Sequence, residues 1–311
     1  MFFSYKQEKS EEQMQKITVE KGGSRLDKFL HEHFRGEITR SQISSAIKNA
    51  RVMVNDGQVK SGTILRKDDI IEVGDFEVES NVMPEDIALD IVFEDEHLMV
   101  INKPRGMVVH PGAGVQSGTL LNALMYKKFS DPNLIRCGIV HRLDKNTCGL
   151  MLVAKTAKSQ EKLGEMFESH SISRIYLGLV EGHLKTSGTV TKNIIRNPKN
   201  RTLYTVTDKN EGRRAVTHYY PLDRLKYGSH NVTLTRFRLE TGRTHQIRVH
   251  LKSIGHPLIG DPEYNPKSSI KFHGQLLESV FLEFTHPITR KILTFEIQPS
   301  QEFQKILNKI K

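Results

Sequence analysis

The stretch from Gly138 to Thr156, GIVHRLDKNTCGLMLVAKT, constrains the fold more than any other part of this chain. It ends in an apolar run, 150–154, which predicts a strand buried in a sheet. Just before that strand, His141, Arg142 and Asp144 lie within four residues of one another. The fold must therefore hold one acid among basic neighbours on a short, rigid connection, which suits a single working carboxylate. The alternative is a turn or helix-capping aspartate beside a solvated arginine.

A second cluster of polar side chains lies in the stretch TGRTHQIRVHLKSIGHPLIGDPEY, residues 241–264. The pattern predicts a helix over 245–254 that Gly255 ends. Taken alone, the cluster is either a functional site or the solvated start of a helix. Its polar members are Arg243, Thr244, His245, Gln246, Arg248 and His250.

A third motif, SISRIYLGLVEG, places Tyr176 on a predicted strand. A tyrosine on a strand most often belongs to the core, but its aromatic face can also stabilise an unstacked nucleic acid base.

Together the three motifs resemble those of the RluA family of RNA pseudouridine synthases, and the similarity extends over about residues 17–300. The resemblance implies that Asp144 is the nucleophile or general base, that Arg248 forms its ion pair, and that Tyr176 stacks on the target uracil. An arginine suits this role because it keeps a buried carboxylate ionised and does not lose its own proton. Cys148 replaces the usual Ser or Thr. Three routes for Asp144 stay open: attack on the base, attack on the sugar, or removal of a sugar proton.

The same resemblance implies that Arg142 fills the space left by the flipped nucleotide. It also implies that Arg174 lies on the side facing RNA. The segment 196–214 carries six basic residues and two acids and predicts a mobile loop that contacts phosphates. The expected RNA-binding residues of this part of the chain are Arg142, Arg174, Arg243 and His245.

Residues 17–74 predict a small unit with two helices and short strands, in which Ser24 and Ser41 are candidate helix caps. The unit resembles the S4-like RNA-binding domain that small-subunit ribosomal protein S4 shares with several RNA-modifying enzymes. Ala50 departs from that pattern, in which glycine is usual. The alternative is a purely structural two-helix unit. The resemblance implies RNA contacts from Arg25, Lys28, Arg40 and Lys48.

The distribution of charge is uneven. The net charge is +10, yet residues 68–102 hold twelve acids and no Lys or Arg. A basic chain with one acidic stretch is compatible with a polyanionic partner, or with a solvated cationic face.

We predict a disordered N-terminus over 1–16, the S4-like domain over 17–74, an acidic linker over 75–86 and a catalytic domain over 87–311.

The predicted fold class is α+β, because strands outnumber helices and often follow one another directly. We expect a mixed, largely antiparallel sheet flanked by helices in the catalytic domain, and a small α+β domain before it. Helices are predicted over 119–129 and 157–170. Strands are predicted over 98–101, 215–222, 231–239, 280–285 and 292–297.

Composition and motifs also limit the function. No apolar run approaches the roughly twenty residues of a membrane span, and the first residues do not have the pattern of a secretory signal. Two cysteines provide neither a disulfide framework nor a thiolate zinc site. A Walker loop and a GxGxxG turn are both missing from the sequence. We expect a cytoplasmic isomerase that uses no cofactor and no metal. Its expected partner is structured RNA, most of all large-subunit ribosomal RNA or an assembling ribosomal particle.

Two other functions stay open. One is a non-catalytic RNA-binding or ribosome-assembly factor on the same fold. The other is a metal hydrolase that uses His141, Asp144, His245 and His250.

Glu278 stands where the family usually has a histidine, which puts in question any structural hydrogen bond of that histidine.

Overall fold

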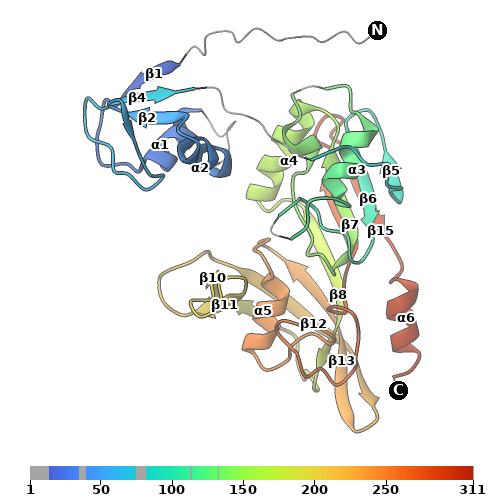
Figure 1. The fold of residues 1–311 in the computed structure, drawn as a ribbon. Coiled ribbons are helices and arrows are strands. Elements are labelled where there is room, and N and C mark those ends of the chain that lie inside the picture. Colours follow the sequence, from blue (N-terminus) through green and yellow to red (C-terminus); the bar gives the residue numbers. More distant parts are fainter. Residues whose placement is uncertain (1–13, 35–39, 75–81, 113, 132, 311) are drawn as a thin grey trace, which may run out of the picture. The chain divides into compact units, whose positions relative to one another are not determined.

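The chain forms two compact units, residues 1–81 and 82–311 (Figure 1). The computed structural model describes residues 14–34, 40–74, 82–112, 114–131 and 133–310, without the side chains of 40–42. The predicted disorder of 1–16 therefore lies almost wholly outside the described residues.

The smaller unit is a four-stranded antiparallel sheet with two helices packed on it. The strand order is β1-β4-β2-β3, and the buried core includes Leu26, Leu30, Ile43, Ile47 and Ile71. Its elements are β1 (Gln15–Thr18), α1 (Leu26–His33), α2 (Arg40–Lys48), β2 (Val52–Val54), β3 (Gly57–Gln58) and β4 (Ile70–Val73).

Both predicted helix caps of this unit are wrong. Helix α1 begins after Arg25, whose side chain makes no capping bond, and not after Ser24. The Ser24 carbonyl oxygen instead accepts the N–H of Leu65, so this residue belongs to a connection between segments. Ser41 lies inside α2, which begins at Arg40.

Helix α2 ends in a left-handed residue that explains the usual glycine. Ala50 has φ of 56°, and its N–H donates to the carbonyl oxygen of Ile47 at 3.2 Å. The N–H of Arg51 donates to the Ala46 carbonyl oxygen at 2.9 Å. These two bonds form a Schellman motif, in which glycine avoids the steric cost of positive φ.

The larger unit is built on one sheet of nine strands among the described residues, in the order β5-β6-β7-β14-β8-β13-β12-β9, with β15 paired to β14. Only the β7–β14 pair is parallel within it. The strands are β5 (Ile91–Glu94), β6 (Leu98–Lys103), β7 (Cys148–Ala154), β8 (Ser173–Glu181), β9 (Gly188–Thr191), β12 (Val216–Tyr227), β13 (His230–Leu239), β14 (Leu277–Thr285) and β15 (Ile292–Glu296). A largely antiparallel sheet in an α+β fold confirms the predicted fold class.

Strands β6 and β7 are buried on both faces, which explains their nearly continuous apolar sequences. Met151 and Val153 face one core cluster, together with residues of α3 (Leu120–Lys127) and α5 (Gln246–Ser253). Leu150 and Leu152 face a second cluster, which α4 (Ala157–Glu168) helps to form. The predicted helices and strands of this unit are present, with ends shifted by a few residues. A further helix, α6 (Gln301–Leu307), follows the sheet.

One domain boundary differs from the expectation. The predicted linker runs through residue 86, but Glu85 already belongs to the larger unit. Its carboxylate accepts the N–H of Gly118 at 3.0 Å, just before α3, where negative charge is favourable. Residues 75–81 of that linker lie outside the described residues.

The predicted loop over 196–214 is partly a hairpin. Strand β10 (Asn193–Arg196) pairs with β11 (Tyr204–Thr207) in an antiparallel ladder. The sequence does not reveal this hairpin, because β11 is a four-residue run with two threonines and carries little apolar signal.

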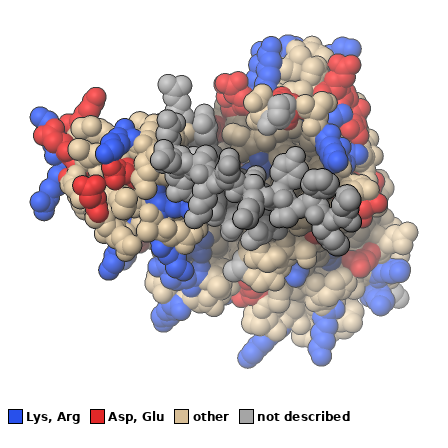
Figure 2. Space-filling view, turned by 45° about the horizontal axis from the view of Figure 1, so that its top comes forward, with Lys and Arg blue, Asp and Glu red and all other residues tan. Residues whose placement is uncertain are grey.

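Exposed Lys and Arg side chains are interspersed with Asp and Glu on the face shown in Figure 2. Surface charge therefore does not by itself outline a path for RNA on that face. Among the described residues, no helix is long and apolar enough to cross a membrane.

We predict that Ala50→Gly stabilises the smaller unit by about 0.5–1 kcal/mol, because glycine removes the strain of positive φ at the end of α2. Amide hydrogen exchange in α2 and β2 of the full-length chain should slow by a few-fold. Gly57→Ala, at a position of ordinary φ, is the control for a general effect of exchanging the two residue types. Faster exchange in Ala50→Gly would contradict this explanation.

Candidate active site

The loop that carries Asp144 is fixed from inside by its neighbours. His141 accepts the N–H of Leu152 on β7 through Nε2 at 2.8 Å, and Leu143 is buried in the core. The N–H of Thr147 donates to the backbone oxygen of Asp144 at 3.1 Å, which closes a turn after it. Alternate residues of the loop therefore point inward, and the Asp144 carboxylate is held at the surface of a pocket.

Two buried cations hold the other side of this loop. Lys103 is fully buried and donates to the carbonyl oxygens of Pro104, Met107 and Lys145 at 2.8, 2.9 and 3.2 Å. Burial lowers the pKa of Lys103 to about 8, which still leaves the ammonium charged at pH 7. Arg105 donates to the next carbonyl oxygen, that of Asn146.

Arg248, on α5, is the electrostatic centre of the site. Its Nε and Nη2 donate to the two carboxylate oxygens of Asp261 at 2.7 and 2.8 Å. Nη2 also contacts Glu263 at 2.5 Å, and Nη1 donates to Asp144 Oδ2 at 3.2 Å. The ion pair expected between Asp144 and Arg248 is thus present in the structure, but the bidentate partner is Asp261.

The charge of Arg248 is secure in this setting. Burial lowers its pKa, but the hydrogen bonds to Asp261 and the charges of Asp144, Asp261 and Glu263 raise it above the ordinary value. The Asp144 side chain is 17% exposed, so it reaches the pocket while its partner is buried. A fixed cation therefore lies 3.2 Å from a partly desolvated carboxylate.

His245 precedes α5 in a left-handed conformation, with φ of 56°. Its Nδ1 lies 2.8 Å from the Tyr264 hydroxyl, and its Nε2 lies 4.0 Å from Asp144 Oδ1. Burial lowers the pKa of His245, which favours a neutral ring at pH 7. Strain of this kind in a non-glycine residue occurs where the surrounding contacts enforce it, often at functional sites.

These side chains surround a pocket of about 400 Å³. The structure brings together in it all the site residues predicted for this unit. They are Arg142, Asp144, Arg174, Tyr176, Arg243, His245 and Arg248.

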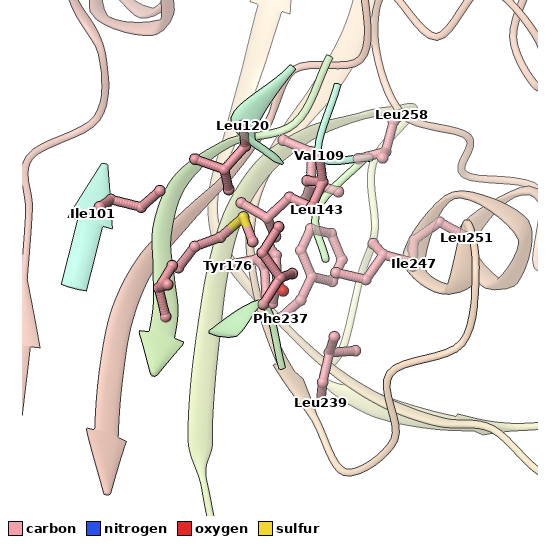
Figure 3. Close-up of a cluster of buried hydrophobic side chains, with 14 of the residues drawn as sticks. Ile101, Val109, Leu120, Leu143, Tyr176, Phe237, Leu239, Ile247, Leu251 and Leu258 are labelled. Carbon is pink, nitrogen blue, oxygen red and sulfur yellow. The ribbon is translucent and has the colours of Figure 1, made fainter. Parts of the chain in front are cut away.

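Tyr176 belongs both to the pocket wall and to the core. Figure 3 shows it among Leu143, Ile247 and Phe237, and its side chain is buried. Burial raises the pKa of Tyr176, so the hydroxyl keeps its proton at neutral pH. Its ring is rigidly held, as an aromatic platform for a base requires.

The predicted RNA-binding arginines differ in exposure. Arg142 is exposed at the pocket, whereas Arg243 is partly buried and donates through Nε to the Arg214 carbonyl oxygen at 3.1 Å. Arg174 is buried in the pocket wall, with 6% exposure.

In the smaller unit, two predicted RNA-binding residues have acidic partners. Arg25 binds Asp27 at 3.0 Å, and Lys28 lies 3.7 Å from Glu32. Lys48 is exposed at the end of α2, and the side chain of Arg40 lies outside the described residues. The RNA contacts of these four residues stay predictions.

Two of the three histidines proposed for a metal hydrolase are bound to groups outside the pocket. His141 binds the backbone of β7, as described above. His250 is fully buried, with Nδ1 2.9 Å from the Thr217 hydroxyl and Nε2 3.2 Å from the Lys192 carbonyl oxygen. In the part of the chain that the structure describes, no group of three or more His, Cys, Asp or Glu could hold a metal ion.

Sequence reasoning did not identify Asp261, Glu263 and Tyr264 as site residues. All three lie in the GDPEY end of the second motif. Two acids in the same motif as Arg248 were a usable signal, but they follow it by 13 and 15 positions and contact it only because the chain turns back against α5.

The Glu278 that replaces a histidine has its own partners. Its carboxylate accepts Arg105 Nη2 at 3.0 Å and the Ser300 N–H at 2.7 Å. A buried ion pair with Arg105 and a hydrogen bond from Ser300, which precedes α6, thus satisfy the side chain at this position.

Comparisons with known proteins agree with this geometry. A family model described as RNA pseudouridylate synthase matches residues 97–253. The chain is 41% identical to "Ribosomal large subunit pseudouridine synthase D" of Pseudomonas aeruginosa over 94% of this chain and 93% of that protein. It is 39% identical to the "Uncharacterized RNA pseudouridine synthase YlyB" of Bacillus subtilis, over 94% and 96%.

A solved structure, "Human RNA Pseudouridylate Synthase Domain Containing 1", is similar in fold. It has a TM-score of 0.56 at 23% identity, and covers 68% of this chain and 83% of that one.

We predict that Asp261→Asn lowers the free energy of unfolding by about 3 kcal/mol, because it leaves a buried guanidinium without its main counter-charge. Urea unfolding followed by circular dichroism measures this change. Glu263→Gln is the matched control. Its side chain is 38% exposed, so its loss should stay below about 1 kcal/mol. A larger loss in Glu263→Gln than in Asp261→Asn would contradict the assignment of Asp261 as the principal partner.

Proposed function

The chain belongs to the RluA family of RNA pseudouridine synthases, and from this premise we propose that it isomerises specific uridines in large-subunit ribosomal RNA to pseudouridine. The observation that carries the proposal is the Asp144 carboxylate, which faces a pocket and is paired with the buried Arg248 at 3.2 Å. The names of its relatives, ribosomal large subunit pseudouridine synthase D, support the substrate class.

The reaction is an isomerisation in which atoms are only rearranged. The bond from uracil N1 to ribose C1′ breaks, the base turns, and a bond from C5 to C1′ forms. A proton leaves C5, and N1 ends with a proton. No electron is gained or lost, so the reaction needs no oxidant or reductant. The chain has to supply a carboxylate and a pocket that encloses the base.

In the proposed mechanism Asp144 is the reactive group. The cation of Arg248 lies beside its carboxylate, and the hydrogen bonds that Arg248 donates to Asp261 fix that cation in place. Asp144 attacks the base, attacks the sugar or removes a sugar proton; all three routes begin from the same ionised carboxylate. The two bonds to Asp261 also limit the rotation of the guanidinium, so its third nitrogen stays directed at Asp144.

The proposed role of Tyr176 is to hold the base after it leaves the RNA stack. Its buried ring supplies a stacking surface beside Asp144, and its protonated hydroxyl can donate a hydrogen bond. The proposed role of Arg142 is to occupy the space that the flipped nucleotide leaves, and its exposure at the pocket supports this role.

We also propose that the smaller unit is an S4-like RNA-binding domain and that the enzyme works in the cytoplasm. In this proposal the smaller unit raises the local concentration of RNA at the larger one. The rival function, a ribosome-assembly factor without catalysis, is disfavoured because Asp144, Tyr176 and Arg248 are all present and meet in one pocket.

Asp144→Asn should lower the rate of tritium release from ribosomal RNA labelled at uracil C5 by roughly 1000-fold or more. An amide does not replace the carboxylate in any of the three routes. The wild type should release tritium. Glu168→Gln, a carboxylate on the exposed rim of the same pocket, is the control and should keep most of the activity. Release by Asp144→Asn at the wild-type rate would mean that another group carries the reaction. Binding of RNA without release by the wild type would favour the assembly factor.

Replacing both Lys28 and Lys48 by Gln should weaken binding of ribosomal RNA and reduce the slope of log affinity against log salt by about 2, since two phosphate contacts are lost. Filter binding over a range of salt concentrations measures both quantities. Lys21→Gln with Lys60→Gln is the control with the same change of charge on the same unit. An unchanged slope in the first variant would remove Lys28 and Lys48 from the proposed RNA contacts.

A further inference from the structure

One buried cation of the pocket is not used by the mechanism above. Arg174 lies on β8, two residues before Tyr176, so both side chains point to the same face of the strand and line the same pocket. Arg174 is only 6% exposed, and its Nε is buried without a hydrogen-bond partner among the described residues.

No counter-charge balances this guanidinium in the described part of the chain. Burial lowers the pKa of Arg174, and no carboxylate of the described residues raises it. Asp144, Asp261 and Glu263 are engaged with Arg248 instead. The remaining acid of the pocket, Glu168, is exposed on its rim. A buried and unpaired cation is costly, by several kcal/mol in general, and folded proteins usually pair such groups.

The surroundings of Arg174 hold it in place without neutralising it. Its guanidinium carbon lies 5.3 Å from the centre of the Phe167 ring. On the other side, a Cβ at Gly242 would come within 2.8 Å of Nη1, so the absence of a side chain there leaves room for the guanidinium. The position is thus built from an aromatic ring and a glycine, and the open side faces the pocket.

We propose that Arg174 is a subsite for a phosphate group that flanks the uridine turned into the pocket. The inference rests on the proposed function, because RNA is the source of the phosphate. A uracil carbonyl could accept a hydrogen bond from Arg174, but it is neutral and would leave the buried charge uncompensated. A phosphodiester supplies one negative charge and two oxygens, which the planar fork of arginine binds together.

This subsite differs from contacts made by exposed arginines. The exposed basic residues of the hairpin β10–β11 can bind phosphates anywhere along the RNA strand. Arg174 can reach only a phosphate that enters the pocket with the target nucleotide. Binding at this subsite would therefore favour the extruded nucleotide over the stacked one, and would lower the free energy of the flipped state.

The test uses substrate RNA with a single uncharged methylphosphonate at the linkage on either side of the target uridine. At one of the two linkages, the wild type should lose roughly 10- to 100-fold in kcat/KM, as expected for a hydrogen bond to a charged group. Arg174→Met should lose a similar factor on natural RNA, and the methylphosphonate at that linkage should slow it by less than about 3-fold further. A methylphosphonate several nucleotides away is the control for a general effect of lost charge.

Equal further losses in the wild type and Arg174→Met, at both flanking linkages, would overturn the proposal. That result would make Arg174 a structural partner of Phe167. Gly242→Ala gives a second variant, in which Arg174 itself is retained but displaced, and it should reproduce the methylphosphonate insensitivity of Arg174→Met.

Binding of inorganic phosphate separates this inference from the proposed function. Phosphate should raise the melting temperature of the wild type, relative to chloride of equal ionic strength, by more than it raises that of Arg174→Met, in which only the general stabilising effect of phosphate remains. This readout needs no catalysis, so it still decides the subsite if the wild type releases no tritium. An equal rise in both proteins would count against Arg174 as the phosphate ligand.

Discussion

The guanidinium of Arg248 is the group on which the site depends. A cation with only 4% side-chain exposure would be costly without counter-charges, and Asp261 meets it with both carboxylate oxygens. The bidentate pair with Asp261 uses two of the three guanidinium nitrogens of Arg248 and leaves the third, Nη1, directed at Asp144. The counter-charge of Asp144 is therefore a group that is itself fixed in place. The cost of burying this cluster is offset by geometry, since every member is paired.

The fold brings these groups together from distant parts of the chain. Asp144 and Arg248 are separated by 104 positions, and they meet because rigid elements deliver both of them. The loop of Asp144 leads directly into β7, whose two faces are buried, while α5 packs its apolar side against the same core. Lys103 and Arg105 then hold two consecutive carbonyl oxygens just after Asp144. A loop with so many internal bonds to a buried sheet has little freedom to move its carboxylate.

Local sequence patterns predicted the elements whose own residues determine them. The apolar run of β7, the helical spacing of α3 and the glycine after α5 are signals of this kind. The patterns failed where a partner far away in the sequence decides the outcome. The acidic composition of the predicted linker does not reveal that Glu85 binds the backbone before α3, and Asp261 looks like an ordinary turn residue until the fold places it against Arg248. The expectation that Arg174 faces RNA stays a prediction, but its burial was not foreseen, because it depends on Phe167 and Gly242 from other segments.

The glutamate at position 278 illustrates how a buried site accommodates a change of charge. A carboxylate with 2% exposure needs positive partners, and Glu278 has Arg105 together with the backbone and hydroxyl of Ser300 at the start of α6. Arg105 in turn donates to the carbonyl oxygen of Asn146, two residues after Asp144. The exchanged residue thus connects the C-terminal helix to the loop of Asp144 through one shared cation. Since Arg105 would be left partly unpaired without Glu278, the two residues form a unit, and restoring the family histidine alone would unbalance the charge beneath that loop.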